Sequence, residues 1–408
     1  MITRRRHPRA LVGASLLLLA ACSDPLQPTA AVPPRVAPAL TAQQLFARYV
    51  ALGTSNSQGA QSGGVNAAGQ RAAWPAQLAA RVGTPFSLPL VQDPGCNPPL
   101  LPPLALNIAL VGAFSAFGAG GDFIGAVSTT CMPLRDGIVP PTNSVAISGA
   151  DVHDALYSTI ESKAAVGARV TSLYRRVLAP GQTQVTAMLA QQPTFVSVEL
   201  AANDVLPAST GRIEAMTPYA NWQADYDAVV AAVKSTGAGA VLVGLPTDAA
   251  KFPSIRRSRE LFNQAPYLLT LGISVSLNCY FSSNYVFVPG YVLTLLSKAP
   301  TTATCSNVPG TADYVLTSSE VSAINARMAQ INTHIQQTAA ANGYASFALS
   351  ALYDLPKPSL DLYKVLFSNT PFGADMSLDG VHPSASGQRI LADAAARAVG
   401  ARYGVTIP

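Results

Sequence analysis

Short apolar strands alternate with helical segments along most of this 408-residue chain. Each strand stops at a glycine, an asparagine or a proline, and a helical stretch follows before the next strand begins. This rhythm is typical of a parallel sheet with helices on both faces, so the sequence predicts an α/β fold. The expected strands are 48–52, 144–147, 194–200 and 240–246. The expected helices begin near Ala72, span 222–234, run from a capping box at Thr317 and Glu320 to about Ala341, and span 388–401 after a cap at Ser384 or Ser386.

Residues 1–21 have the pattern of a lipoprotein signal peptide. Arginines precede an apolar run over 10–19 that is too short to span a bilayer. The small residues before Cys22 resemble a bacterial lipobox, in which the cysteine becomes the lipidated N-terminus; the alternative is an ordinary cleaved signal with a chance cysteine. Ser23 at the next position resembles outer-membrane lipoproteins. We therefore expect an exported protein, anchored by lipid on Cys22 to the cell envelope, at the outer membrane.

Behind the signal, residues 22–44 are rich in proline and alanine and predict an extended tether. Residues 45–408 form the expected folded domain. The signal holds four of the 26 basic residues and none of the 21 acidic ones, which leaves 22 basic against 21 acidic residues. This balance predicts no nucleic-acid partner.

Four further cysteines, an even number in an exported chain, predict two disulfides. Three pairings are possible, and we favour the local ones, Cys96 with Cys131 and Cys279 with Cys305. These pairs bracket two apolar insertions that interrupt the strand–helix rhythm, near 98–130 and 253–310. Leu104 to Gly121 is apolar enough to suggest a membrane span, but it follows two prolines inside the domain, so burial or a lid is expected. No metal-ligand spacing occurs, and no metal or cofactor is expected.

Ser55 lies where the first strand breaks into a turn flanked by Gly53 and Gly59. Near the other end of the chain, Asp379 precedes His382 by three residues, just before the last helix. A serine hydroxyl is a poor nucleophile until a base removes its proton, and an imidazole is the better base when a carboxylate fixes its tautomer. Serine, aspartate and histidine thus occur in an order that suits nucleophilic catalysis.

With three further stretches, these residues resemble the SGNH (GDSL) esterase and lipase family. The first block of that family is Gly-Asp-Ser with a glycine four residues on, a place that Gly59 fills here. Gly149 matches the second block, Asn203 with its neighbours Ala202 and Asp204 matches the third, and the run from Asp379 to Pro383 matches the last. The resemblance covers 48–401 without the two insertions. It implies a flavodoxin-like three-layer α/β/α sandwich, the SGNH hydrolase fold.

The resemblance also implies roles for these residues. Ser55 would attack an ester carbonyl, His382 would take its proton, and Asp379 would orient His382. The backbone N–H groups of Ser55 and Gly149 and the side chain of Asn203 would form the oxyanion hole. Two departures leave the activity open: Thr54 stands where the family has an acid, and Ala201 stands where it usually has glycine.

The expected function is hydrolysis of a small-molecule or lipid carboxylic ester through an acyl-enzyme. An O-acyltransferase of the same fold would use the same intermediate, and a catalytically silent surface-binding lipoprotein is an alternative from another class. Of the other histidines, His153 is expected to have a surface or capping role and His334 to lie on a solvated helix face. The sequence leaves the oligomeric state open.

Overall fold

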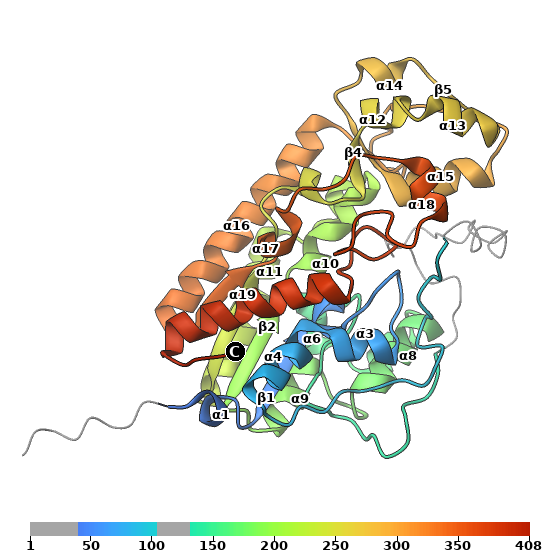
Figure 1. Ribbon diagram of the computed structural model, residues 1–408. Coiled ribbons are helices and arrows are strands. Elements are labelled where there is room, and N and C mark those ends of the chain that lie inside the picture. The colour runs from blue at the N-terminus through green and yellow to red at the C-terminus, as the bar shows by residue number, and fades with distance from the viewer. Residues whose placement is uncertain (1–39, 104–130) are drawn as a thin grey trace, which may run out of the picture. The chain divides into compact units, whose positions relative to one another are not determined.

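Four parallel strands form the central sheet in the computed structural model, which describes residues 40–103 and 131–408 (Figure 1). Their order is β1 (Tyr49–Gly53), β2 (Phe195–Glu199), β3 (Gly239–Gly244) and β9 (Ala345–Ala348). The register pairs Gly53 with Glu199, so these two residues end neighbouring strands side by side. The predicted parallel sheet is confirmed. The signal peptide, Cys22, the tether up to residue 39 and Leu104 to Gly121 lie outside the described residues.

The predicted strand over 144–147 is only partly formed. Ser144 makes an isolated parallel bridge to Ala51, and the N–H groups of Val145 and Ile147 donate to the carbonyls of Ala51 and Gly53. This segment therefore runs along the free edge of β1 without the full ladder of a strand. It ends at the turn that carries Gly149.

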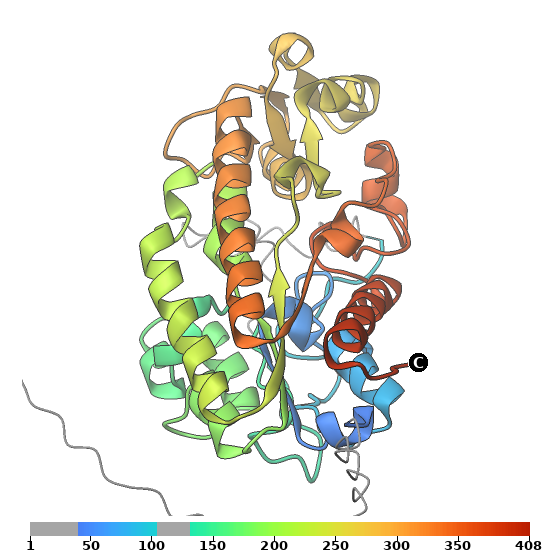
Figure 2. The same ribbon diagram turned by 90° about the vertical axis from the view of Figure 1, so that its left-hand side faces the viewer.

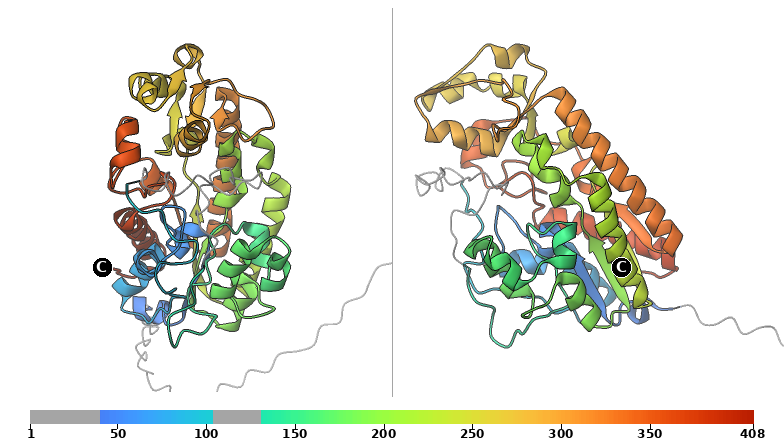
Figure 3. Two further views of the ribbon diagram at one scale, coloured as in Figure 1. Left: turned by 90° about the vertical axis from the view of Figure 1, so that its right-hand side faces the viewer. Right: turned by 180° about the vertical axis from the view of Figure 1, so that it is seen from behind.

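Helices cover both faces of the sheet (Figure 2). One face carries α9 (Gln184–Ala190), α11 (Tyr219–Ser235) and α16 (Ser318–Asn342), and the other carries α4 (Trp74–Val82) and α19 (Ala385–Tyr403). Figure 3 shows α11 and α16 lying side by side on one face of the sheet. Thr317 caps α16 in a capping box with Glu320, as predicted, and Ser384 rather than Ser386 caps α19.

The remaining helices of the described residues are short. They are α1 (Ala42–Leu45), α2 (Ser55–Gln58), α3 (Ala67–Ala72), α6 (Val152–Tyr157), α7 (Ile160–Ala164), α8 (Ala168–Val177), α10 (Ala202–Val205), α12 (Ser258–Phe262), α13 (Ala265–Thr270), α14 (Asn278–Phe281), α15 (Val288–Ser297), α17 (Ser350–Tyr353) and α18 (Leu362–Phe367), with 3₁₀ turns at Leu206–Thr210, Ile213–Ala215 and Ala249–Lys251. Because α1 begins at Ala42, the last residues of the predicted 22–44 tether are helical. In the described ranges, no helix has the length and apolar character needed to cross a membrane.

The second insertion and the short strand that follows it form two small sheets beyond the carboxyl ends of the central strands (Figure 1). The antiparallel sheet joins β4 (Ile255–Arg257), β6 (Tyr285–Phe287) and β8 (Val315–Leu316), and the parallel one joins β5 (Ile273–Val275) and β7 (Thr301–Ala303). Disulfides join Cys279 to Cys305 and Cys96 to Cys131. This is the local pairing that the sequence favours.

His334 does not lie on a solvated helix face, so that prediction is wrong. Its side chain is only 13% exposed, its Nε2 lies 2.7 Å from Asp227 Oδ1, and its ring packs edge-on against Trp222. The periodicity of α16 did not reveal this contact because Trp222 and Asp227 come from α11, the neighbouring helix.

Candidate active site

Ser55 is the first residue of α2, directly after β1 ends. The turn at the other end of α2 depends on Gly59, which has a φ of 81°; an added Cβ would lie 2.2 Å from the carbonyl oxygen of Gly69. Only glycine satisfies both conditions. The helix α2 therefore ends after a single turn. Ser55 lies at the carboxyl edge of the sheet and is 6% exposed.

His382 is held by Asp379 across a distance of 2.6 Å between Nδ1 and Oδ2. The buried carboxylate of Asp379 accepts four more hydrogen bonds, from the N–H groups of Gly63, Val381 and His382 and from the Ser377 hydroxyl. Burial alone would raise the pKa of Asp379, but the His382 charge and these hydrogen bonds lower it to about 2. Asp379 is therefore an anion across the physiological range.

The pKa of His382 is raised above its ordinary value. Burial opposes the charged imidazole, but the Asp379 carboxylate and its hydrogen bond outweigh burial, and the more distant charge of Glu199 adds to them. The bond from Nδ1 to Asp379 leaves Nε2 as the nitrogen that can take up a proton.

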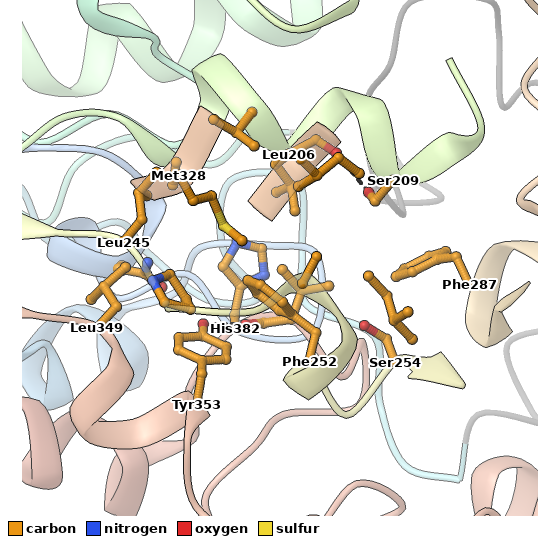
Figure 4. Close-up of a pocket in the computed structure, with 18 of the residues that line it drawn as sticks. Leu206, Ser209, Leu245, Phe252, Ser254, Phe287, Met328, Leu349, Tyr353 and His382 are labelled. Carbon is orange, nitrogen blue, oxygen red and sulfur yellow. Dashed lines mark hydrogen bonds between the residues drawn. The ribbon is translucent and has the colours of Figure 1, made fainter. Parts of the chain in front are cut away.

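Ser55 and His382 line one pocket (Figure 4). Among the residues that the structure describes, no hydrogen bond joins the Ser55 hydroxyl to His382. Such bonds are often long in a substrate-free site and shorten when the substrate binds. The structure thus brings together the three residues that the sequence singles out, although Ser55 and Asp379 are more than 300 positions apart.

Gly149 and Asn203 lie on adjoining turns. The φ of Gly149 is 85°, a conformation that favours glycine, and an added Cβ would meet no atom within 4 Å. Asn203 Nδ2 donates to the carbonyl of Ala150 at 2.7 Å, and Gln58 of α2 accepts the N–H of Ser148 at 2.7 Å. These two bonds link the Gly149 turn to α10 on one side and to the serine-bearing α2 on the other.

Ala201 does not disturb this arrangement. Its φ is 179°, which is extended backbone that any residue adopts, so the position does not require the glycine that the resemblance leads one to expect. Ala201 is buried, and its methyl group belongs to the hydrophobic core.

The rest of the pocket wall is mostly apolar. Figure 4 shows the His382 ring among the side chains of Leu245, Met328 and Phe252, with Phe287 and Ser254 farther along. The second insertion supplies part of this wall, through Ser254, Ile255 and Phe287. The full set of lining residues is Ser55, Asn56, Ala202, Val205, Leu206, Ser209, Leu245, Pro246, Ala249, Phe252, Ser254, Ile255, Phe287, Ile324, Met328, Leu349, Tyr353, Val381 and His382.

Sequence reasoning missed Glu199, the last residue of β2. Its carboxylate lies behind the serine turn and accepts hydrogen bonds from Thr54 and Ser57. The sequence did hold a signal for this residue: Glu199 is a charged residue inside an apolar strand, and a buried carboxylate must find hydrogen-bond donors.

Of the other histidines, His153 is 62% exposed and lies 3.0 Å from Asp225, in keeping with the predicted surface role. Within 40–103 and 131–408, no cluster of three histidine, cysteine or acidic side chains could hold a metal.

Comparisons with known proteins identify the family of this chain. One solved structure with low similarity is a mutant of Axe2, an acetyl-xylooligosaccharide esterase from Geobacillus stearothermophilus; the two sequences are 14% identical, the match covers 87% of this chain and 94% of that one, and the TM-score is 0.35. Another is LAE5, an alpha/beta hydrolase enzyme from the metagenome of Lake Arreo, Spain, with 14% identity, coverage of 86% of this chain and 94% of that one, and a TM-score of 0.34. A search of curated proteins found no match. The sequence model of the GDSL-like lipase/acylhydrolase family matches residues 49–395. The chain therefore belongs to the GDSL-like lipase/acylhydrolase family and is a carboxylic ester hydrolase of the serine type.

Proposed function

We propose that Ser55, His382 and Asp379 form the catalytic triad of this esterase. The observation that carries the proposal is the 2.6 Å contact between Asp379 and His382 Nδ1, with the same imidazole lining the pocket that contains Ser55. An anionic partner at Nδ1 fixes the tautomer in which Nε2 is a base and stabilises the imidazolium that forms.

In this mechanism His382 Nε2 takes the Ser55 proton while Oγ bonds to the ester carbonyl carbon. The tetrahedral intermediate expels the alcohol, which receives the proton from His382, and leaves an acyl group on Ser55. Water then attacks the acyl-enzyme with His382 again as base, and the acid product and free Ser55 are released. We assign the oxyanion hole to the N–H groups of Ser55 and Gly149 and to the Asn203 side chain.

The substrate that suits this site is an ester with an apolar group. Met328, Leu206, Leu245 and Phe252 line the space beside His382, and few polar atoms face it. A hydrocarbon chain buried there gains about 0.8 kcal/mol per methylene, whereas a polyol would leave hydroxyl groups without partners. We therefore propose esters with an apolar acyl or alcohol part as the substrate class.

We further propose that the enzyme is exported and is anchored to the outer membrane through lipid on Cys22. Two disulfides in one chain support an oxidising compartment. Metabolic labelling with an alkyne fatty acid should mark the wild type, and Cys22→Ser should abolish the label and release the protein from membranes. Unchanged labelling of that variant would contradict lipidation at Cys22.

Single replacements test the triad. Ser55→Ala and His382→Ala should each lower kcat for p-nitrophenyl butyrate by about 10⁴-fold or more, because either change removes the nucleophile–base pair. Circular dichroism should show an unchanged fold, and a fluorophosphonate probe should label the wild type but not Ser55→Ala. Retention of wild-type turnover by Ser55→Ala would exclude the mechanism.

A further inference from the structure

Glu199 is a buried carboxylate wedged between the ends of two strands and the helix that begins at Ser55. Its side chain belongs to the last residue of β2, next to Gly53 of β1, and is 2% exposed. Four groups donate to it: the N–H of Thr54 at 3.1 Å, the Thr54 hydroxyl at 2.9 Å, the N–H of Ser57 at 3.2 Å and the Ser57 hydroxyl at 3.0 Å. Thr54 and Ser57 flank Ser55 on both sides in the sequence.

These bonds replace a local helix cap. Thr54 occupies the N-cap position of α2, yet its side chain makes no bond to its own helix. The N–H groups at the start of a helix have no partner within it and need an acceptor. Glu199 accepts the Thr54 and Ser57 N–H groups from the neighbouring strand. The Ser55 N–H is not among its donors and stays available for a substrate oxygen.

Gly53 shows how closely this assembly is packed. A Cβ added there would lie 2.6 Å from the Ser57 hydroxyl oxygen and 3.2 Å from a carboxylate oxygen of Glu199. A buried carboxylate costs several kcal/mol unless it is hydrogen-bonded, so the four donors and Glu199 constrain one another. A displacement of Glu199 would therefore move the turn that carries Ser55.

We propose that Glu199 is a positioning residue, whose carboxylate fixes the nucleophile turn through the hydrogen bonds from Thr54 and Ser57. Burial raises the pKa of Glu199, and the hydrogen bonds from Thr54 and Ser57 oppose that rise. The inference rests on the proposed role of Ser55 as nucleophile. The charge of Glu199 also acts on His382, the proposed base. The titratable groups that face His382 are Asp379, which contacts it, Glu199, which is more distant, and Tyr353, whose buried hydroxyl donates to the Val381 carbonyl. Removing the Glu199 charge should therefore lower the pKa of His382, whereas a purely structural residue would leave that pKa unchanged.

Glu199→Gln tests the proposal, because it keeps the side-chain shape and removes the charge. We expect kcat for p-nitrophenyl butyrate to fall by about 10- to 100-fold with KM nearly unchanged, since a displaced nucleophile loses rate rather than binding. The acidic limb of the kcat/KM profile should also move to lower pH. Glu214→Gln, at an exposed surface position, is the matched control and should leave both quantities unchanged.

Relocating the charge makes the test sharper. Thr54→Asp alone would press two carboxylates together and should lower kcat. In the double variant Thr54→Asp/Glu199→Gln, one carboxylate again faces one hydrogen-bond donor at this contact. Its kcat should therefore be at least 5-fold higher than that of Glu199→Gln. If Glu199→Gln does not fold, Ser57→Ala, which removes a single donor, should still lower kcat several-fold with a similar Tm.

Wild-type kcat and pH profile in folded Glu199→Gln, strictly additive losses in the double variant, or wild-type kcat in Ser57→Ala would each overturn the inference. The outcome for Ser55→Ala separates it from the proposed function. If Ser55→Ala is inactive while Glu199→Gln matches the wild type, only the role of Glu199 fails; if Ser55→Ala is active, the triad itself fails.

Discussion

Asp379 concentrates five hydrogen bonds on one buried carboxylate, and this arrangement decides how the site responds to pH. Two of the donors are the N–H groups of Val381 and His382, so the short loop folds around its own acid. The Gly63 N–H comes from the segment after the nucleophile turn, which ties that segment to the loop that holds the base. The residue that fixes the imidazole thus also aligns two distant parts of the chain.

The pH profile of the enzyme should reflect this pair. His382 must be neutral to accept a proton, and its pKa is raised, so kcat/KM should fall as the pH drops through a value above 6.5. Asp379→Asn removes the anion that raises this pKa and favours the wrong tautomer, so it should lower kcat by about 10⁴-fold and move the residual acidic limb to lower pH. Rate profiles on a neutral ester measure both effects. An acidic limb at the same pH in both proteins would show that Asp379 does not set the pKa of His382.

At the scale of elements, α10 and the Gly149 turn form one unit through Asn203. One hydrogen of Asn203 Nδ2 goes to the Ala150 carbonyl, and we propose that the second binds the oxyanion. Asn203→Ala should lower kcat by ~10²–10³-fold with a smaller change in KM, because the lost donor acts mainly in the transition state. Asn203→Asp keeps the shape without the donor and should be equally impaired. A change confined to KM would make Asn203 a binding residue instead.

Elements with a strong local pattern were predictable, and those defined by distant partners were not. The strands at 195–199 and 239–244 and the capping box of α16 follow from apolar runs and from Thr317 with Glu320, so sequence was sufficient. The edge segment after Ser144 lacks a full ladder because it has a partner on one side only. Glu199 was missed because its partners, Thr54 and Ser57, belong to another element. His334 was misjudged for the same reason, since Trp222 and Asp227 lie on the neighbouring helix.

At the scale of the whole molecule, the pocket is assembled from segments that no local pattern connects. The pocket lining comes from strand ends, α10, α16, α17 and the second insertion, and each contributes one to three residues. Parallel strands direct their carboxyl ends to one edge of the sheet, so the loops that follow them meet there. The resemblance could place Ser55 and His382 at this edge. It could not show the apolar wall, because Phe252, Phe287 and Met328 belong to no catalytic motif.

The Cys279–Cys305 disulfide connects the insertion to this wall. The Cys305 carbonyl accepts from Asn284, which immediately precedes β6, and Phe287 at the end of β6 lines the pocket. Loss of the disulfide should loosen the outer part of the wall while the triad stays in place. For Cys279→Ser/Cys305→Ser we expect the rate ratio of p-nitrophenyl octanoate to acetate to fall by about 3- to 10-fold, since only the longer chain needs that wall.

The other disulfide provides the matched control. Cys96 pairs through its backbone with Val65, close to Gly63, which donates to Asp379. Cys96→Ser/Cys131→Ser should therefore affect the base rather than the wall, and lower the rates on both esters alike. Both variants are measured well below their Tm, because removing a disulfide costs about 2–5 kcal/mol of stability. Equal losses on acetate and octanoate in the Cys279→Ser/Cys305→Ser variant would mean that the insertion takes no part in binding the acyl chain.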